Sequence, residues 1–197
     1  KMYAAQTYNN IPASDGRRIQ IGWGRITHPG MPFNQMMTFP TELTLRSTRN
    51  GIRLFSEPIA EIKQLHNTSH YWSDLTVKEA NAKLKSVKGD LFHLKMSIEL
   101  VEGTSFQFKK DGALLVNYSF NYNTLNDVFY GGDHIEDEIL TLELLIDRTS
   151  FELFADHGRF SIIEQLPEPE NEEGFQFGGS EIIVRQLEVH ELKSIWK

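Results

Sequence analysis

Two histidines have the spacing of a helical metal pair. His66 and His70 stand four positions apart, so a helix would place both imidazoles on one face, where they could bind a transition metal. No carboxylate lies between them as in the His-Glu-x-x-His motif, and the following residues, Tyr71 and Trp72, do not continue a helical pattern. Cysteine is absent, which excludes disulfides and thiolate ligands. We therefore expect no metal site and no cofactor.

Carboxylates are the second group that could do chemistry. Asp147 and Asp156 stand at two turns and could be interpreted as an acid/base pair. Aspartate is favoured at turns, however, because its side chain hydrogen-bonds to the nearby backbone. The acidic run at residues 168–173 lacks the alternating Asp/Asn and glycine pattern of a calcium loop, so we interpret it as a solvated loop. Spacing alone gives no catalytic residue.

Residues 139–166 are predicted to form the element around which the fold is built. Leu140, Leu142 and Leu144 alternate with polar positions, and two turn sequences interrupt the alternation, which is typical of three antiparallel strands. Many short strands, few helix signals and the turn Asp111-Gly112 extend this pattern along the chain. Residues 69–197 are therefore expected to form an antiparallel two-sheet β-sandwich.

Residues 1–58 form a separate all-β unit in this interpretation. Strands are expected at residues 3–8 and 17–23, and a second hairpin is expected around Asn50-Gly51. That is about the content of one four-stranded sheet, which alone would leave strand edges unpaired and an apolar face uncovered. Residues 59–68 are expected to be a linker or a short helical turn.

Charge is distributed unevenly between the two units. The net charge is −7, yet residues 1–58 carry a balance of +4, which leaves −11 on the remainder. The acidic majority argues against a nucleic-acid partner. No apolar run reaches membrane-spanning length, so we also expect no membrane partner. The compartment is left open.

Several motifs, in the same order, resemble the C-terminal part of glycoside hydrolase family 32, the levanases, inulinases and invertases. YAAQT at 3–7, GRRIQIGW at 16–23 and MTFPTELTLR at 37–46 resemble the last propeller blade of that family. IDRTSFELF at 146–154 resembles the signature of its C-terminal β-sandwich, and the ending LKSIW at 192–196 also fits. The resemblance therefore covers nearly the whole chain.

The resemblance implies a module of a fructan-hydrolysing glycosidase. Family members join a five-bladed propeller to a β-sandwich and hydrolyse fructosyl bonds with retention, using a carboxylate nucleophile and a carboxylic acid/base. Their Trp-Met-Asn-Asp-Pro-type, Arg-Asp-Pro and Glu-Cys motifs do not occur in this sequence. No catalytic residue can therefore be assigned, and the fragment is expected to be inactive, with a structural role. Residues 1–58 would be a partial last blade, so the expected partners are the missing blades or a second copy of the chain. A fructan or sucrose-type carbohydrate would bind the intact enzyme.

The resemblance implies two aromatic residues that would bind the substrate. In the family, the Tyr of Tyr-Ala-Ala-Gln and the Trp of Ile-Gly-Trp line the pocket for the terminal fructose, which implies this role for Tyr3 and Trp23. An aromatic ring offers an apolar wall to a sugar, and a phenol adds a hydrogen bond. The alternative is that both rings pack in the propeller core. Gly24 departs from the family pattern, in which an apolar residue commonly follows the Trp.

Two alternatives come from other classes of function. The sandwich could be a carbohydrate-binding module that presents exposed aromatic rings, or the chain could be an oligomerisation element. The candidate rings are Tyr71, Trp72, Phe120, Tyr122, Phe129 and Tyr130. A bacterial fructan degrader would be exported to the periplasm or outside the cell.

Overall fold

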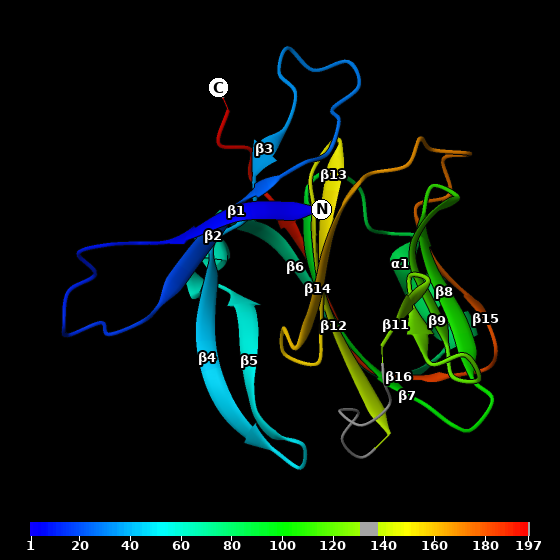
Figure 1. Ribbon diagram of the computed structural model, residues 1–197. Coiled ribbons are helices and arrows are strands. Elements are labelled where there is room, and N and C mark those ends of the chain that lie inside the picture. Colours follow the sequence, from blue (N-terminus) through cyan, green and yellow to red (C-terminus); the bar gives the residue numbers. More distant parts are fainter. Residues whose placement is uncertain (131–137, 197) are drawn as a thin grey trace.

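Three layers of antiparallel sheet make up the protein. The computed structural model describes residues 1–130 and 138–196 (Figure 1). A sheet from the N-terminal residues lies on one side, a six-stranded sheet lies in the middle, and a five-stranded sheet lies on the other side. The predicted all-β fold, an antiparallel two-sheet sandwich preceded by an incomplete propeller blade, is confirmed. Among the described residues, no helix is long and apolar enough to cross a membrane.

The N-terminal sheet has four strands in the order β1-β2-β4-β5, and a short strand β3 also pairs with β2. The predicted hairpins are both present. At the second one, Gly51 has a φ of +89°, which glycine tolerates without steric cost. The strands are β1 (Met2–Thr7), β2 (Ile19–Gly24), β3 (Met36–Met37), β4 (Thr41–Thr48) and β5 (Gly51–Pro58).

The central sheet contains the predicted three-strand meander at one edge. Leu140, Leu142 and Leu144 point to the core that fills the sandwich, as their alternation predicts. The next strands in the sheet come from distant parts of the sequence. In spatial order the strands are β14 (Phe160–Gln165), β13 (Ser150–Ala155), β12 (Ile139–Ile146), β7 (Phe92–Glu99), β16 (Ile183–Leu192) and β6 (His66–Thr76).

The third sheet closes the other side of the core. The predicted turn joins β8 to β9, and both Asp111 and Gly112 have positive φ angles there. Phe106, Phe108 and Tyr118 point inward and are fully buried. In spatial order the strands are β11 (Val128–Phe129), β10 (Thr124–Leu125), β9 (Ala113–Ser119), β8 (Ser105–Lys110) and β15 (Phe175–Gly179).

One helix, α1 (Val77–Leu84), was not predicted from the sequence. It begins with a capping box: Glu79 N donates to Thr76 Oγ1 at 3.3 Å, and Thr76 N donates to a Glu79 carboxylate oxygen at 2.9 Å. Ala80 and Leu84 are buried against the sandwich core, and Asn81 makes two hydrogen bonds to the backbone of β15. The Thr-x-x-Glu signal was present in the sequence, although the helix is too short for a clear periodic pattern.

The N-terminal sheet packs on the outer face of the central sheet. A short 3-10 helix, η1 (Ala60–Leu65), connects the two, and β6 begins at His66, inside the expected linker 59–68. Ile62, Leu145 and Phe154 form a small second core there. All six residues of β13 are buried, because the sandwich core covers one face of the strand and the N-terminal sheet covers the other.

A close backbone contact joins the two units. Ser56 N on β5 donates to Gly158 O, at 3.0 Å, in the turn between β13 and β14. A Cβ added at Gly158 would lie 2.0 Å from Ser56 O, and Gly158 has a φ of +75°. Only glycine fits this position, so the second turn of the meander is a contact point for the N-terminal sheet.

Candidate functional site

Tyr3 and Trp23 lie side by side on the N-terminal sheet. They are paired in the β1–β2 register, and residues directly opposite each other share one face of a sheet. Their ring centroids are 6.0 Å apart at an interplanar angle of 63°, an edge-to-face arrangement. Tyr3 is 58% exposed and Trp23 is 37% exposed, so in this chain neither ring is packed in a core.

A cation and a third apolar side chain extend this surface. The Arg25 guanidinium carbon lies 5.0 Å from the centroid of the Tyr3 ring, a cation–π contact. Met37 on β3 pairs with Trp23 and is also exposed. A bulge between Tyr3 and Gln6 interrupts the β1–β2 register beside the rings. The open face therefore combines two aromatic rings, a methionine and a positive charge.

The other face of β2 is closed by tight packing, which explains the departure at Gly24. A Cβ at Gly24 would lie 2.7 Å from Ile163 Cδ1 on β14, so a larger residue would require the Ile163 side chain to shift. Gly22 is similar, because its Cβ would lie 2.6 Å from Met2 Cγ. The Gly22 N–H also donates to Thr38 Oγ1 at 3.0 Å. These contacts fix β2 from behind, so Trp23 is held in place without being covered.

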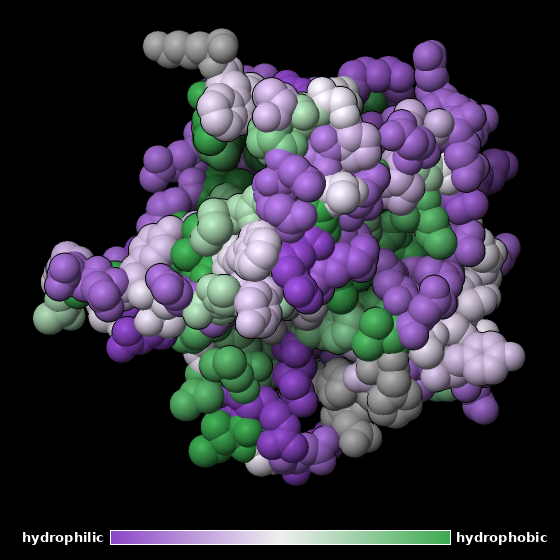
Figure 2. Space-filling model, turned by 45° about the horizontal axis from the view of Figure 1, so that its top comes forward, coloured by the Kyte–Doolittle hydropathy of each residue, from purple (hydrophilic) through white to green (hydrophobic). Residues whose placement is uncertain are grey.

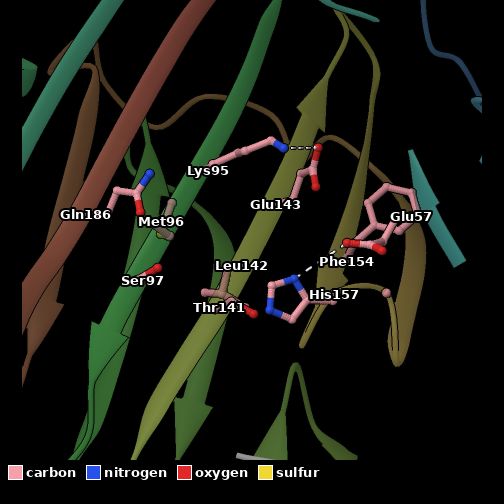
Figure 3. Close-up of a pocket in the computed structure, with 11 residues that line it drawn as sticks. Glu57, Lys95, Met96, Ser97, Thr141, Leu142, Glu143, Phe154, His157 and Gln186 are labelled. Carbon is pink, nitrogen blue, oxygen red and sulfur yellow. Dashed lines mark ion pairs between the residues drawn. The ribbon is translucent and has the colours of Figure 1, made fainter. Parts of the chain in front are cut away.

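A second candidate is a pocket of about 160 Å³ where β5 and the turn after β13 meet the outer face of the central sheet (Figure 3). Figure 3 shows two ion pairs at its walls. His157 Nδ1 lies 3.5 Å from Glu57 Oε1, and Lys95 Nζ lies 3.5 Å from Glu143 Oε1. The pocket can hold a small polar molecule.

The charges in this pocket are already paired. Burial raises the pKa of Glu57, but hydrogen bonds from His157 and Arg46 outweigh it, and the net pKa is below the ordinary value. The hydrogen bond to Glu57 raises the pKa of His157. The two groups therefore stabilise each other as an ion pair, and neither is available as a free acid or base.

His66 and His70, the histidine pair noted in the sequence, lie on opposite faces of β6. The β6–β16 register shifts where His66 pairs with Leu192 and Thr68 pairs with Glu191, so one extra residue of β6 is accommodated. His70 lies on the face that Val189, its partner on β16, turns toward the sandwich core. Its ring is stacked on that of Trp72, and the two ring centroids are 5.3 Å apart. The side chains of His66 and His70 therefore cannot bind one ion together.

His66 instead joins two histidines that the sequence did not suggest. His93 on β7 and His190 on β16 are paired in register and buried, and the three side chains each place a nitrogen within 4.8 Å of the others. Burial, together with the charges of the other two rings, lowers the pKa of His66 to about 4. Burial also lowers the pKa of His190. No sequence signal could have found this set, because it depends on long-range register and on the bulge.

The remaining polar candidates have structural roles. Asp147 Oδ1 accepts a hydrogen bond from Arg148 N at 2.7 Å, as expected for a turn residue. Asp156 differs from that expectation, because its carboxylate is buried and accepts a hydrogen bond from Tyr130 OH at 2.5 Å. Burial and the Asp156 charge raise the pKa of Tyr130. The contact fixes the end of β11 to the meander.

The aromatic residues of the sandwich do not form one platform. Tyr71, Phe120 and Tyr122 are exposed, but Tyr71 belongs to the central sheet, whereas Phe120 and Tyr122 belong to the β9–β10 connection in the other sheet. Trp72 is half-buried against the main core, and Tyr130 is buried. The side chain of Phe129 lies outside the described part of the structure.

Sequence comparisons show relatives among levanases. The chain is 25% identical, over 227 aligned residues, to a levanase from Bacillus subtilis (strain 168), and the match covers 98% of the chain and 33% of that protein. It is 23% identical to a levanase from Bacillus sp. (strain L7), over 99% of the chain and 24% of that protein. The chain thus spans about a third or less of these relatives. No family model matches the chain.

Structural comparisons find a similar fold in solved glycoside hydrolases. An exo-inulinase from Aspergillus awamori matches 99% of the chain and 44% of its own length, with a TM-score of 0.73 and 17% identity. A fructofuranosidase from Schwanniomyces occidentalis complexed with fructose matches 98% of the chain and 48% of its own, with a TM-score of 0.70 and 11% identity. A family 32 glycoside hydrolase from Bifidobacterium adolescentis matches 100% of the chain and 32% of its own length, with a TM-score of 0.56 and 20% identity.

The resemblance found in the motifs is therefore confirmed. Over nearly its whole length the chain is similar to levanases in sequence and to family 32 enzymes in fold. These relatives support a module related to fructan-hydrolysing glycosidases, and they do not favour an independent carbohydrate-binding module or an oligomerisation element.

Proposed function

We propose that this chain is the C-terminal module of a fructan-hydrolysing glycosidase of the levanase or β-fructosidase type. One observation carries the proposal: the match to levanases runs through both the N-terminal sheet and the sandwich, covering 98% of the chain. The two units therefore occur together in those relatives in the same order. Residues 1–58 would be most of the last propeller blade, and residues 69–197 the accessory sandwich.

Tyr3 and Trp23 would form part of the wall of the fructosyl pocket. Their position on an open face, fixed from behind by Gly22 and Gly24, suits a surface that must stay rigid while it contacts a ligand. The edge-to-face rings offer apolar area to the C–H face of a sugar, and the Tyr3 hydroxyl can hydrogen-bond. These residues bind and orient the substrate, and they do not catalyse.

The missing blades would cover the hairpin β4–β5. Leu45 and Leu54 are paired across it, and Ile52 points the same way two residues before Leu54, so all three share one face. They are exposed by 73%, 51% and 65% respectively. Figure 2 shows hydrophobic residues gathered at its lower left, over this part of the N-terminal sheet. A propeller blade packs face to face on its neighbour, so this apolar face fits that contact.

The sandwich would hold the blade in place. The meander contacts the blade at Ser56, through the Gly158 backbone, and at Phe39, whose N–H donates to Glu152 Oε1 at 2.7 Å. Arg17 also pairs with Glu61 on η1, at 2.8 Å. A blade fixed at these points keeps Tyr3 and Trp23 in a constant position for substrate.

Fructose release from levan, inulin and sucrose tests the proposal. The 197 residues alone contain neither of the two required carboxylate motifs and should give no turnover above background. The gene product that carries them should release fructose. Turnover by the 197 residues alone, or an inactive gene product, would contradict the proposal.

A further inference from the structure

We propose that His66, His93 and His190 bind a zinc ion on the outer face of the central sheet. They come from three neighbouring strands, β6, β7 and β16, and lie where the chain leaves η1 and enters the sandwich. The site does not depend on fructan hydrolysis. It is also a different set from the pair of His66 and His70, which the bulge in β6 places on opposite faces of the strand.

The nitrogen positions are close to those that a tetrahedral ion needs. With zinc–nitrogen bonds of about 2.0–2.1 Å, the ligand nitrogens lie about 3.3 Å from each other. His66 Nε2 and His93 Nδ1 are already 2.9 Å apart, and each of the three side chains places a nitrogen within 4.8 Å of the others. The three nitrogens are therefore near enough to bind one ion once the His66 ring is reoriented.

Second contacts set the orientation of the two buried rings. Glu143 Oε1 lies 2.7 Å from His93 Nε2, which leaves Nδ1 directed at His66. A carboxylate on the far nitrogen of a histidine is the usual support for a metal ligand, because it fixes the ring and raises its basicity. On His190, Ser69 Oγ lies 2.8 Å from Nδ1, so Nε2 is left to face the ion.

A carboxylate is available as the fourth ligand. Glu188 Oε2 lies 3.3 Å from His190 Nε2, on the outer face of the same strand. Three imidazoles and one carboxylate are a ligand set that suits zinc. The two carboxylates also offset the positive charge of Lys95, whose Nζ lies 3.5 Å from Glu143.

One movement is required for the ion to bind. The rings of His66 and His190 are stacked, with centroids 3.8 Å apart and planes at 9°, and lone pairs in parallel planes cannot meet at one point. His66 is half-buried at the first position of β6, whereas His93 and His190 are buried, so His66 is the ring that turns. Once bound, the ion would tie the end of η1 to the outer face of the central sheet.

Zinc binding by the purified chain tests this site. After treatment with a chelator, the chain is dialysed against graded ZnCl₂, and bound metal is measured by mass spectrometry. We expect saturation at about one zinc per chain. His66→Gln should weaken the affinity at least about 10-fold, whereas His70→Gln, the control on the opposite face of the same strand, should leave it unchanged.

Cobalt provides a second readout. Co²⁺ should give the intense visible absorption of a tetrahedral nitrogen–oxygen site in the wild-type chain and in His70→Gln, and lose it in His66→Gln and His93→Gln. Far-UV circular dichroism checks that each variant is folded. Because the His66 side chain is only half-buried, His66→Gln should disturb the fold least. Failure to bind zinc stoichiometrically, or equal affinity of His66→Gln and wild type, would overturn the proposal and leave the cluster a metal-free hydrogen-bond network.

Discussion

At the scale of single residues, Glu152 links the two units of the chain. It lies on β13, is 7% exposed, and accepts a hydrogen bond from the Phe39 N–H of the N-terminal sheet. Burial raises its pKa to about 7, although that hydrogen bond acts in the opposite direction. A carboxylate in this position makes the junction sensitive to pH.

Glu152→Gln should remove this sensitivity. The pKa of Glu152 is about 7 in the folded chain against 4.5 in the unfolded chain. Between these pH values the folded state keeps a proton that the unfolded state has lost. The contribution of Glu152 to the free energy of unfolding is therefore fully present below about pH 4.5 and is lost as the pH rises through 7. Glutamine keeps the hydrogen-bond acceptor and never ionises, so the variant should gain up to about 3 kcal/mol over wild type between pH 5 and pH 8.

Urea unfolding at both pH values measures this gain. Glu168→Gln, in the exposed loop after β14, is the control and should show no such difference. An identical free-energy difference between Glu152→Gln and wild type at pH 5 and pH 8 would show that Glu152 does not titrate as described.

At the scale of elements, alternating apolar residues and turn sequences predicted the strands and turns that local sequence determines. Leu140, Leu142 and Leu144 gave the meander, and Asn50-Gly51 gave the hairpin, because both signals lie within a few residues. The motifs also point to Tyr3 and Trp23, whose role in substrate binding stays a prediction. Helix α1 was missed because eight residues carry little periodicity. The histidine cluster could not be predicted, since pairing across distant strands and one bulge create it.

The cap of α1 should contribute measurably to stability. Thr76→Ala removes the side chain that accepts from Glu79 N, and such a loss typically costs about 1 kcal/mol. Chemical denaturation of the purified chain measures the change. Lys78→Ala, an exposed substitution in the first turn, should change stability by less than about 0.5 kcal/mol. Equal effects of the two substitutions would contradict the assigned cap.

The contact at Gly158 should be more costly to disturb than its backbone angle alone implies. Gly158→Ala adds a Cβ that would lie 2.0 Å from Ser56 O, so the blade must move away from the turn. Gly103→Ala is the matched control, because Gly103 has a similar φ of +82° with nothing within 4 Å of the added Cβ. We expect the control to lose about 1 kcal/mol and Gly158→Ala to lose at least about 2 kcal/mol.

The same pair of variants gives a local readout. Hydrogen exchange of the β4 and β5 amides should accelerate in Gly158→Ala and stay unchanged in Gly103→Ala, because only the first substitution separates the blade from the sandwich. Similar losses of stability in both variants would mean that the Ser56 contact carries little of the junction energy.

At the scale of the whole molecule, a well-filled sandwich supports a sheet with an uncovered face. The sandwich has one continuous core between its two sheets, whereas the N-terminal sheet exposes Leu45, Ile52 and Leu54 together. The net positive charge of residues 1–58 also contrasts with the net negative charge of the rest of the chain. These differences fit a sandwich that can stand alone and a blade that needs neighbours.

The uncovered face should make the isolated chain self-associate. Sedimentation velocity at increasing concentration should show dimers or larger species, and Leu45→Ser with Leu54→Ser should shift the chain toward monomer. Val101→Ser, an exposed apolar position in the sandwich, is the control and should have no effect. A wild-type chain that stays monomeric at all concentrations would show that this face is stable in water.

The most direct measurement of the central claim is kcat/KM for levan in the gene product that carries these residues, with and without Trp23→Ala. If the blade contributes Trp23 to the fructosyl pocket, the substitution should lower kcat/KM at least about 10-fold, or about 1.4 kcal/mol of transition-state stabilisation. Tyr122→Ala, which removes an exposed ring from the sandwich, should leave it unchanged. An unchanged kcat/KM in Trp23→Ala, or a comparable loss in Tyr122→Ala, would contradict the account.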